Sequence, residues 1–521
     1  MKRRKLILHG SLLIAGETGE ESFSDGWVAM EDDRILALGQ GESYQPYAPD
    51  GTLMIDAGGN TVLPGLIDNH FHVVATALHE FRLDFSRAKN FEDVGKTIRS
   101  VEKKADQNMI LGVGLDYTRL EEKRFPDRTI LDRYCSNVPL IIYSQDFHVL
   151  MLNTYAILYF KTPFTLNGVE LDAMDVPTGI FGKQAGAKLD KQIIQSSTEK
   201  ERKLAVEQLM PNLLRRGITS LAAMEGENIK NNFDTDVASE FLYEHKKDYP
   251  VSMDIFYQTV DIPRVLSKNL RRIGGALYLD GTMGSRTAAL SFEYADAPEK
   301  RGVLFFAQED LDHFVERCCE HGLQVSFDAI GDAAIEMALL SFEKANALFD
   351  VKSMRHRIEH AELIDEAQME RAERLGIVLC MQPTYEGYWG SVGGMYQQRL
   401  GDHYGQTNRF RKIIDTGLVL CGGSDSDVTE FNPMLGIHYA VNHPVPQNGV
   451  TLQEALRMYT YNGAIALCRE REIGSLAPGK KADIVILDRD ITQTDAVTLK
   501  DVVVEMTIKG GDILFDRRDY A

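Results

Sequence analysis

The sequence predicts an α/β fold: a TIM (β/α)8 barrel, a composite β-sandwich domain made from both chain ends, and a large insertion after the first barrel strand. Apolar strand-like runs alternate with helical patterns through the middle of the chain, which is typical of a parallel sheet. Short β-rich runs separated by Gly and Asp occupy both ends of the chain. The first strand of the middle region ends in two histidines one residue apart.

The composite domain is predicted from strand-like runs at the two ends of the chain. Near the N-terminus these runs are 6–8, 12–14, 27–30 and 34–38, and near the C-terminus they are 482–487 and 502–511. Chain termini often lie close together in a fold, so we expect residues 1–60 and 474–521 to form one domain. Residues 61–473 are then the barrel with its insertion.

The barrel is predicted from eight apolar runs that alternate with helical patterns. The runs are Leu66 to Phe71, Thr219 to Ala223, Ser252 to Tyr257, Ala276 to Leu279, Gln324 to Phe327, Arg357 to Glu359, Ile377 to Met381, and Leu418 to Cys421. The count requires that residues from about 78 to 197 form an insertion, although this segment has strand-like runs of its own at 110–114 and 140–143. If those runs belonged to the barrel, the order of strands two to eight would be different.

Composition restricts the classes of partner. The 57 Lys and Arg against 77 Asp and Glu give a net charge of −20, which disfavours binding to nucleic acid or to an anionic membrane. The six cysteines contain no Cys-x-x-Cys pair, so we expect a reducing compartment and a cytoplasmic protein. The basic start of the chain followed by an apolar run imitates a signal peptide, but His9 and Gly10 interrupt the run.

Two histidines end the first predicted barrel strand. His70 and His72 are spaced i, i+2, so both side chains point to the same face of a strand and can bind one metal ion. Imidazole is a ligand for zinc, iron, nickel and copper. The alternative is a pair of partly buried histidines that only form hydrogen bonds.

Carboxylates and a third histidine follow later strands, at the end of the barrel where active sites form. Each acid alone has a structural explanation, because it can accept hydrogen bonds from loop amides or from the start of a helix, and we expect Glu359 to serve structure. Several acids and imidazoles at one barrel mouth would repel each other or stay unsatisfied without a cation. The other residues expected at this mouth are Glu225, Asp280, Asp328, His360 and Asp425.

Eight motifs carry a resemblance to a known family. They are LPGLIDNHFH, SQDFHVLMLNTYAI, LDGTMGSRTAAL, AIGDAAIE, RHRIEHAELI, QPTYEGYW, GGSDSDVTEFNPMLGI and GSLAPGKKADIVIL, and they run from residue 63 to residue 487. With these motifs the chain resembles the amidohydrolase superfamily, and within it the YtcJ-like, N-substituted formamide deformylase-like branch. Any one motif alone is weak, whereas the set in this order is specific.

The resemblance implies a metal-dependent barrel hydrolase that acts on amide, urea, formamide or related C–N bonds. His70 and His72 match the paired ligands of the first strand, and His360 matches the ligand of the sixth strand. Asp425 matches the eighth-strand aspartate that contacts the metal-bound water and moves its proton. His148 falls where the family has a histidine in the insertion, and we expect it to contact the substrate.

Two positions depart from the family pattern. Asp328 stands where the family usually has a fifth-strand histidine, and a carboxylate can bind the same metals. Ala276 stands where many members have a carboxylated lysine that bridges two metals. Glu225 is the candidate to replace this bridge; without it the site holds a single metal. We therefore expect one or two divalent ions, with zinc as the expected metal.

The predicted function is metal-assisted hydrolysis of a C–N bond in a small molecule, with Asp425 as general base and acid. Asp280, Arg286 and Trp389 are the candidates for contact with the substrate. A structural ion pair is nevertheless the favoured role for Arg286, and Trp389 is equally suited to packing beneath a loop. Tyr385 and Tyr388 are expected to cover the pocket together with Trp389.

Three alternatives remain open on the sequence alone. The same metal site is compatible with a deaminase or a lactonase, because fold does not determine function. The departures at Asp328 and Ala276 are compatible with a catalytically weak homologue that binds a small molecule. A purely structural or interaction protein is the third alternative. The oligomeric state is open as well, with a homodimer as the common case.

Overall fold

The computed structural model describes residues 4–16, 22–80, 82–100, 109–144, 149–226 and 237–520. The chain divides into two compact units, one made of Met1–Val73 with Met210–Ala521 and the other of Val74–Leu209. The first unit contains the barrel and the sheet of the chain ends. The second unit is the insertion.

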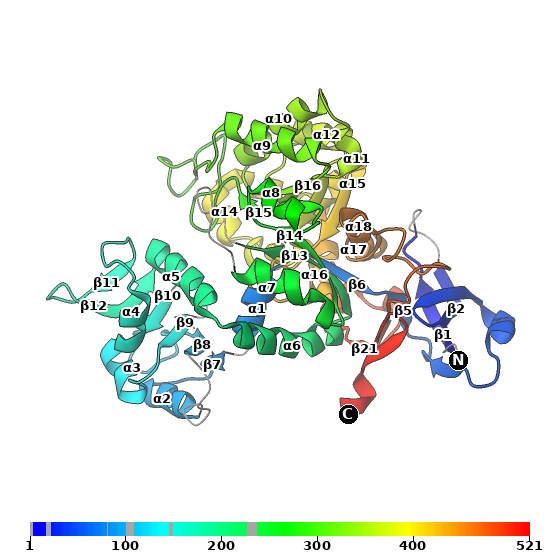
Figure 1. Cartoon of the computed structure of the whole chain (residues 1–521), viewed down its shortest axis with the longest axis horizontal. Helices are drawn as coiled ribbons and strands as arrows, with labels where there is room; N and C mark the ends of the chain where they lie inside the picture. The colour runs from blue at the N-terminus through cyan, green and yellow to red at the C-terminus, as the bar shows by residue number, and fades with distance from the viewer. Residues whose placement is uncertain are drawn as a thin grey trace. The chain divides into compact units, whose positions relative to one another are not determined.

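Eight parallel strands form the barrel (Figure 1), in the order β19-β18-β17-β16-β15-β14-β13-β6. They are β6 (Leu66–Phe71), β13 (Ile218–Glu225), β14 (Ser252–Tyr257), β15 (Arg272–Tyr278), β16 (Gln324–Ala329), β17 (Arg357–His360), β18 (Val378–Met381) and β19 (Val419–Gly422). The strands are almost entirely buried, which explains why they are continuous apolar runs in the sequence. Each of the eight predicted strands overlaps an observed one, and the predicted TIM barrel is confirmed.

The barrel closes between its first and last strands. A parallel bridge joins Phe71 to Ser426, the amide of His72 donates to the carbonyl of Ser426 at 2.9 Å, and the amide of Asp425 donates to the carbonyl of His70 at 2.9 Å. Gly423 permits this approach, because a Cβ atom there would lie 2.6 Å from the amide nitrogen of His70. The closure places Asp425 beside the two first-strand histidines.

Helices follow the barrel strands and pack outside them. In Figure 1, α9, α10 and α12 lie together over one side of the barrel, and α10 contacts both of the others. The helices of this unit are α7 (Val237–His245), α8 (Ile262–Ser267), α9 (Gln308–Glu320), α10 (Asp332–Asn346), α11 (Val351–Met354), α12 (Glu366–Leu375), α13 (Pro383–Trp389), α14 (Met395–Leu400), α15 (Phe410–Asp415), α16 (Pro433–Val441), α17 (Leu452–Met458) and α18 (Tyr461–Ala466).

Both chain ends contribute to one mixed sheet, as predicted. Its order is β22-β21-β20-β5-β1-β2-β3, with β4 paired to β1. Here β5 joins the two ends, because it pairs parallel to β1 and antiparallel to β20. The exact domain boundaries stay a prediction. The strands are β1 (Arg4–Leu13), β2 (Ser22–Glu31), β3 (Arg34–Gln40), β4 (Leu53–Asp56), β5 (Thr61–Pro64), β20 (Ile484–Leu487), β21 (Val504–Lys509) and β22 (Asp512–Asp516).

The insertion has its own six-stranded sheet, in the order β11-β12-β10-β9-β8-β7. The strand-like runs at 110–114 and 140–143 belong to this sheet as β8 and β9, so the predicted order of the barrel strands holds. The strands are β7 (Leu83–Asp84), β8 (Ile110–Leu115), β9 (Leu140–Ser144), β10 (Val149–Leu152), β11 (Val169–Leu171) and β12 (Pro177–Gly182). The helices are α2 (Phe91–Arg99), α3 (Arg128–Tyr134), α4 (Thr154–Phe160) and α5 (Lys183–Ser196), and α1 (Val73–Glu80) and α6 (Glu199–Arg215) connect the insertion to the barrel in sequence.

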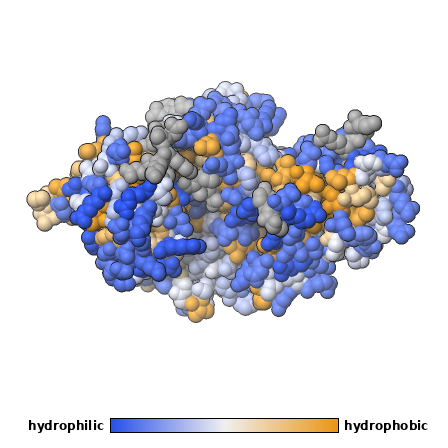
Figure 2. All heavy atoms as spheres, turned by 90° about the horizontal axis from the view of Figure 1, so that it is seen from below, coloured by the Kyte–Doolittle hydropathy of each residue, from blue (hydrophilic) through white to orange (hydrophobic). Residues whose placement is uncertain are grey.

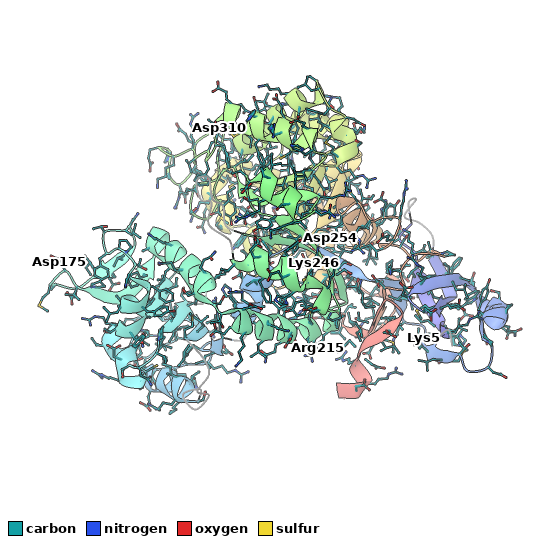
Figure 3. All side chains as sticks on the ribbon, in the orientation of Figure 1. Lys5, Asp175, Arg215, Lys246, Asp254 and Asp310 are labelled. Atoms are coloured by element: carbon teal, nitrogen blue, oxygen red, sulfur yellow. The ribbon has the colours of Figure 1, made fainter. Side chains whose placement is uncertain are left out.

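Hydrophilic residues cover much of the face in Figure 2, and hydrophobic patches lie between them. Ion pairs join barrel elements: Asp254 of β14 pairs with Arg272 of β15 at 3.2 Å and with Arg469 after α18 at 3.0 Å. Figure 3 labels Asp254 and the neighbouring Lys246, whose positive charge acts on the same carboxylate. None of the helices within the described residues is both long and apolar enough to span a membrane.

Candidate metal centre

The C-terminal ends of four barrel strands, β6, β16, β17 and β19, bring five potential metal ligands together. They form two groups that share His70, and within each group the ligand atoms lie within 4.8 Å of one another. The first group is His70, Asp328 and His360, and the second is His70, His72 and Asp425. All of these residues except the partly exposed His72 are buried, so five of the six residues predicted as metal ligands meet in a protected site.

His70 is oriented by a buried carboxylate. Its Nδ1–H donates to Glu359 Oε2 at 2.8 Å, which leaves Nε2 to face the other candidate ligands. Glu359 also accepts from Arg357 through Nε at 2.8 Å and Nη2 at 2.9 Å, and from the hydroxyl of Ser326. A carboxylate behind a histidine determines the tautomer and ring orientation of a metal ligand.

The other two histidines are oriented in the same manner. His72 Nδ1–H donates to the carbonyl oxygen of Met224 at 2.9 Å, and His360 Nδ1–H donates to Gln382 Oε1 at 2.8 Å. Each imidazole therefore keeps Nε2 for the centre of the site. These are the hydrogen bonds that a metal-binding histidine forms with its second nitrogen.

The residues present fit a cation. Within the described residues, His70 Nε2 and Asp328 Oδ1 are buried and have no hydrogen-bond partner. Asp425 Oδ1 lies 3.3 Å from His70 Nε2, and His360 Nε2 lies 3.1 Å from Asp328 Oδ1. Buried polar atoms that converge without partners cost free energy, and a metal ion would satisfy them.

The electrostatics also favour positive charge at this centre. Burial alone would lower the pKa of His70, but Asp425 and Glu359 raise it to about 10. Burial also lowers the pKa values of His72 and His360, but Asp425 raises the pKa of His72 to about 9, and Asp328 raises the pKa of His360 to about 9. Although burial opposes its charged form, the pKa of Asp425 lies well below its usual range because of His70 and His72. A divalent cation would replace the protons that these carboxylates otherwise attract to the imidazoles.

Two of the candidate ligand residues have left-handed backbone conformations. The φ angles are 69° at His360 and 52° at Asp425, and Ala361 continues the turn at 47°. Positive φ values are uncommon outside glycine, and they cluster at functional sites where the surrounding structure enforces them. Here the turns end the strands and direct both side chains to the mouth of the barrel.

Two further acids lie near the centre but outside both groups. Glu225 ends β13 and is 3% exposed, and its charge is among those that raise the pKa of His72. Its role as a metal bridge stays a prediction. Asp280 accepts hydrogen bonds from the amides of Ala289 at 2.7 Å, Ile330 at 3.0 Å and Gly331 at 2.8 Å. These bonds are sufficient to explain Asp280 as a structural residue, so substrate contact by Asp280 stays a prediction.

Four other residues were singled out in the sequence, and the structure shows side-chain contacts for two of them, Arg286 and Trp389. Arg286 forms a bidentate ion pair with Asp296, at 2.9 and 2.7 Å. Trp389 contacts the ring of Tyr385 with centroids 4.5 Å apart. Ala276 lies within β15, and His148 lies outside the described residues. Substrate contacts by Arg286, Trp389 and His148 stay predictions.

Three residues were not predicted in the roles that the structure gives them. Arg357 neutralises Glu359 behind His70, Gln382 orients His360, and the hydroxyl of Tyr385 donates to Asp425 Oδ2. A sequence signal exists only for Arg357, because its i, i+2 spacing from Glu359 places both side chains on one face of a strand. The partners of Gln382 and Tyr385 follow from tertiary structure.

Comparisons with known proteins identify the family of the chain. A profile of the amidohydrolase family matches residues 53–515. The chain belongs to the amidohydrolase family. YtcJ of Bacillus subtilis is 26% identical over 98% of this amidohydrolase and 100% of the relative. The N-substituted formamide deformylase of Arthrobacter pascens is 24% identical over 94% of this chain and 95% of its own.

A solved structure extends the comparison to the fold of this amidohydrolase. An uncharacterized metal-dependent hydrolase from Pyrococcus furiosus is 26% identical and superimposes with a TM-score of 0.79, covering 95% of this chain and 100% of that chain. The resemblance to the YtcJ-like, formamide deformylase-like branch that the motifs indicated is confirmed over nearly the full length. The chain is thus a metal-dependent hydrolase of this superfamily with a buried His and Asp site.

Proposed function

We propose that this amidohydrolase hydrolyses a C–N bond other than a peptide bond, in an amide, formamide or related small molecule. The observation that carries the proposal is the convergence of three imidazoles and two carboxylates, in which the buried atoms His70 Nε2 and Asp328 Oδ1 have no hydrogen-bond partner of good geometry. The name of the Arthrobacter relative, an N-substituted formamide deformylase, supports this class of bond. A cytoplasmic location and a homodimer are part of the same proposal.

The ligand arrangement supports a single divalent ion, with zinc as the proposed metal. The two groups share His70, whose Nδ1 is already bonded to Glu359, and the remaining Nε2 has one lone pair and can bind one metal. The two carboxylates, Asp328 and Asp425, carry two negative charges that one divalent ion would neutralise. Mixed imidazole and carboxylate ligands suit zinc.

Asp425 is the proposed general base and acid. A bound divalent ion lowers the pKa of water and polarises a carbonyl. Asp425 Oδ1 lies at the centre of the site, 3.0 Å from His72 Nε2, where it can accept a proton from the attacking water and deliver it to the leaving nitrogen. The three histidines hold their Nε2 atoms toward the centre, and the ring of Tyr385 stacks on His360 beside it.

Metal analysis and hydrolysis assays test the proposal. Elemental analysis of protein purified without chelators should find about one divalent metal per chain, and the His70→Ala variant should lose it. The exposed His321 at the end of α9 provides the control, because His321→Ala should keep the metal. A panel of formamides, amides and ureas should contain a substrate whose turnover falls at least about 10³-fold in Asp425→Asn.

The assay also separates the other reactions. Release of ammonia from an amino-substituted ring would indicate a deaminase, and turnover of lactones without turnover of any amide would indicate a lactonase. Metal in the wild type without any hydrolysis would favour a weak homologue that binds a small molecule. Wild-type protein that binds no metal after reconstitution would contradict the proposed function altogether.

A further inference from the structure

One short segment contacts two different candidate ligands. It follows β18 and begins α13, and it lies in the first unit with the rest of the barrel. Gln382 Oε1 accepts the hydrogen bond from His360 Nδ1 at 2.8 Å, and the hydroxyl of Tyr385 donates to Asp425 Oδ2. Gln382 is 1% exposed and Tyr385 5% exposed, so neither interaction competes with bulk water.

The two carboxylate oxygens of Asp425 have different partners, because the hydroxyl of Tyr385 binds only one of them. Because Oδ2 is bound by Tyr385, Oδ1 faces the imidazoles, 3.0 Å from His72 Nε2 and 3.3 Å from His70 Nε2. The ring of Tyr385 stacks on His360 with centroids 6.0 Å apart and an interplanar angle of 13°. One side chain therefore restricts both the carboxylate of β19 and the imidazole of β17.

The segment itself is held firmly in place. Pro383 occupies the first turn of α13, where its constrained φ suits the start of a helix. Glu386 is fully buried and accepts hydrogen bonds from Thr407 Oγ1 at 3.0 Å and Asn408 Nδ2 at 2.7 Å. These bonds determine where α13 lies relative to the mouth of the barrel, and with it the position of Tyr385.

We propose that Gln382 and Tyr385 are positioning residues of the metal centre. Gln382 keeps His360 in the tautomer whose Nε2 carries a lone pair, and Tyr385 keeps Asp425 in the rotamer that directs Oδ1 at the imidazoles. The kinetic part of this inference rests on the proposed function, whereas the metal-binding part needs only the site. Hydrogen-bond partners behind metal ligands typically contribute 10–100-fold in metal affinity or activity.

Two variants test the inference in the full-length protein. Tyr385→Phe removes one hydroxyl and keeps the ring on His360, and Gln382→Leu removes the acceptor of the His360 bond. Each should weaken the binding of Co²⁺ and Zn²⁺ to metal-depleted protein by about 10–100-fold, measured by visible absorption and chelator competition. With substrate, Tyr385→Phe of the metal-loaded enzyme should lower kcat by about 10-fold or more and leave KM nearly unchanged.

Control variants separate positioning from general stability. Tyr388→Phe alters the same helix at an exposed tyrosine and should leave metal affinity unchanged. Gln382→Glu keeps an acceptor for His360 and should restore most of the affinity that Gln382→Leu loses. If Gln382→Leu fails to fold, the comparison of Tyr385→Phe with Tyr388→Phe decides the result.

Wild-type metal affinity in both Tyr385→Phe and Gln382→Leu would overturn the inference. Equal losses in Tyr385→Phe and Tyr388→Phe would overturn it as well. If the wild type binds metal but hydrolyses no amide, the proposed function fails, and the metal titrations still decide whether Gln382 and Tyr385 position the ligands.

Discussion

Replacing Glu359 by glutamine should strongly destabilise the barrel. Glu359 and Arg357 are fully buried, and Arg357 donates two hydrogen bonds to Glu359 and one to the carbonyl of Asn69 at 2.6 Å. Glutamine keeps the shape of the side chain but removes its negative charge. Arg357 would then remain buried without a counter-charge, and an uncompensated buried charge strongly destabilises a fold.

The magnitude follows from the pKa of Glu359. Burial alone would raise this pKa, but Arg357 and His70 lower it from 4.5 to about 2. At 1.36 kcal/mol per pKa unit this corresponds to about 3 kcal/mol in favour of the charged form. The value agrees with the roughly 3–5 kcal/mol that removal of one partner of a buried pair typically costs.

Urea unfolding of metal-depleted protein at pH 7, followed by circular dichroism, measures the effect. Glu359→Gln should lower the free energy of unfolding by about 3 kcal/mol. The control is Glu343→Gln, because Glu343 pairs with Arg371 on the surface and its side chain is 37% exposed, so the loss should be at most about 1 kcal/mol. Equal losses in the two variants, or a loss below about 1 kcal/mol in Glu359→Gln, would refute the reasoning.

Four further predictions concern acid unfolding, a buried acid, removal of the metal and the pH dependence of metal binding. The lowered pKa of Glu359 stabilises the fold above about pH 4.5 and ceases to do so as the pH falls toward 2, so unfolding curves of wild type and Glu359→Gln should converge over that range. Asp280→Ala should lower the melting temperature sharply, because three amide N–H groups lose their acceptor and each unsatisfied group costs about 1–3 kcal/mol of stability. A stable variant with only a raised KM would instead indicate contact with the substrate. Chelation should lower the melting temperature of the metal-loaded protein. If the free metal had been at about 100 times its Kd, the free energy of unfolding should fall by about 3 kcal/mol. An unchanged melting curve would argue against a bound metal. Titration of metal-depleted protein with Zn²⁺ should show weaker binding at pH 6 than at pH 8, because the imidazoles must lose their protons before they bind the metal.

The barrel was predictable because its signal is local. Parallel strands buried on both faces are apolar runs, and helical patterns between them mark the crossovers, so all eight strands could be located from the sequence. The i, i+2 spacing of His70 and His72 is equally local, since alternate residues of a strand share one face. Asp328, His360 and Asp425 follow strand ends, where the fold class alone predicts an active site.

The partners of these ligands were not predictable, because they come from distant parts of the chain. Arg357 donates to the carbonyl of Asn69, 288 positions away, and Tyr385 reaches Asp425 across 40 positions. Such contacts depend on the twist of the barrel and on side-chain rotamers. Glu225 and Asp328 look alike in sequence as strand-end acids, yet only Asp328 belongs to a group of converging ligand atoms among the described residues.

The sequence by itself therefore determined the fold class, the family and the residue types at the barrel mouth. Only the tertiary structure decided which of those residues converge within 4.8 Å and which side chains stand behind them. The physical reason is that strand order and side-chain face follow from local periodicity, whereas ligand distances depend on the closure between His70 and Asp425. That closure also depends on the glycine at position 423, which lets the last strand end lie against the first.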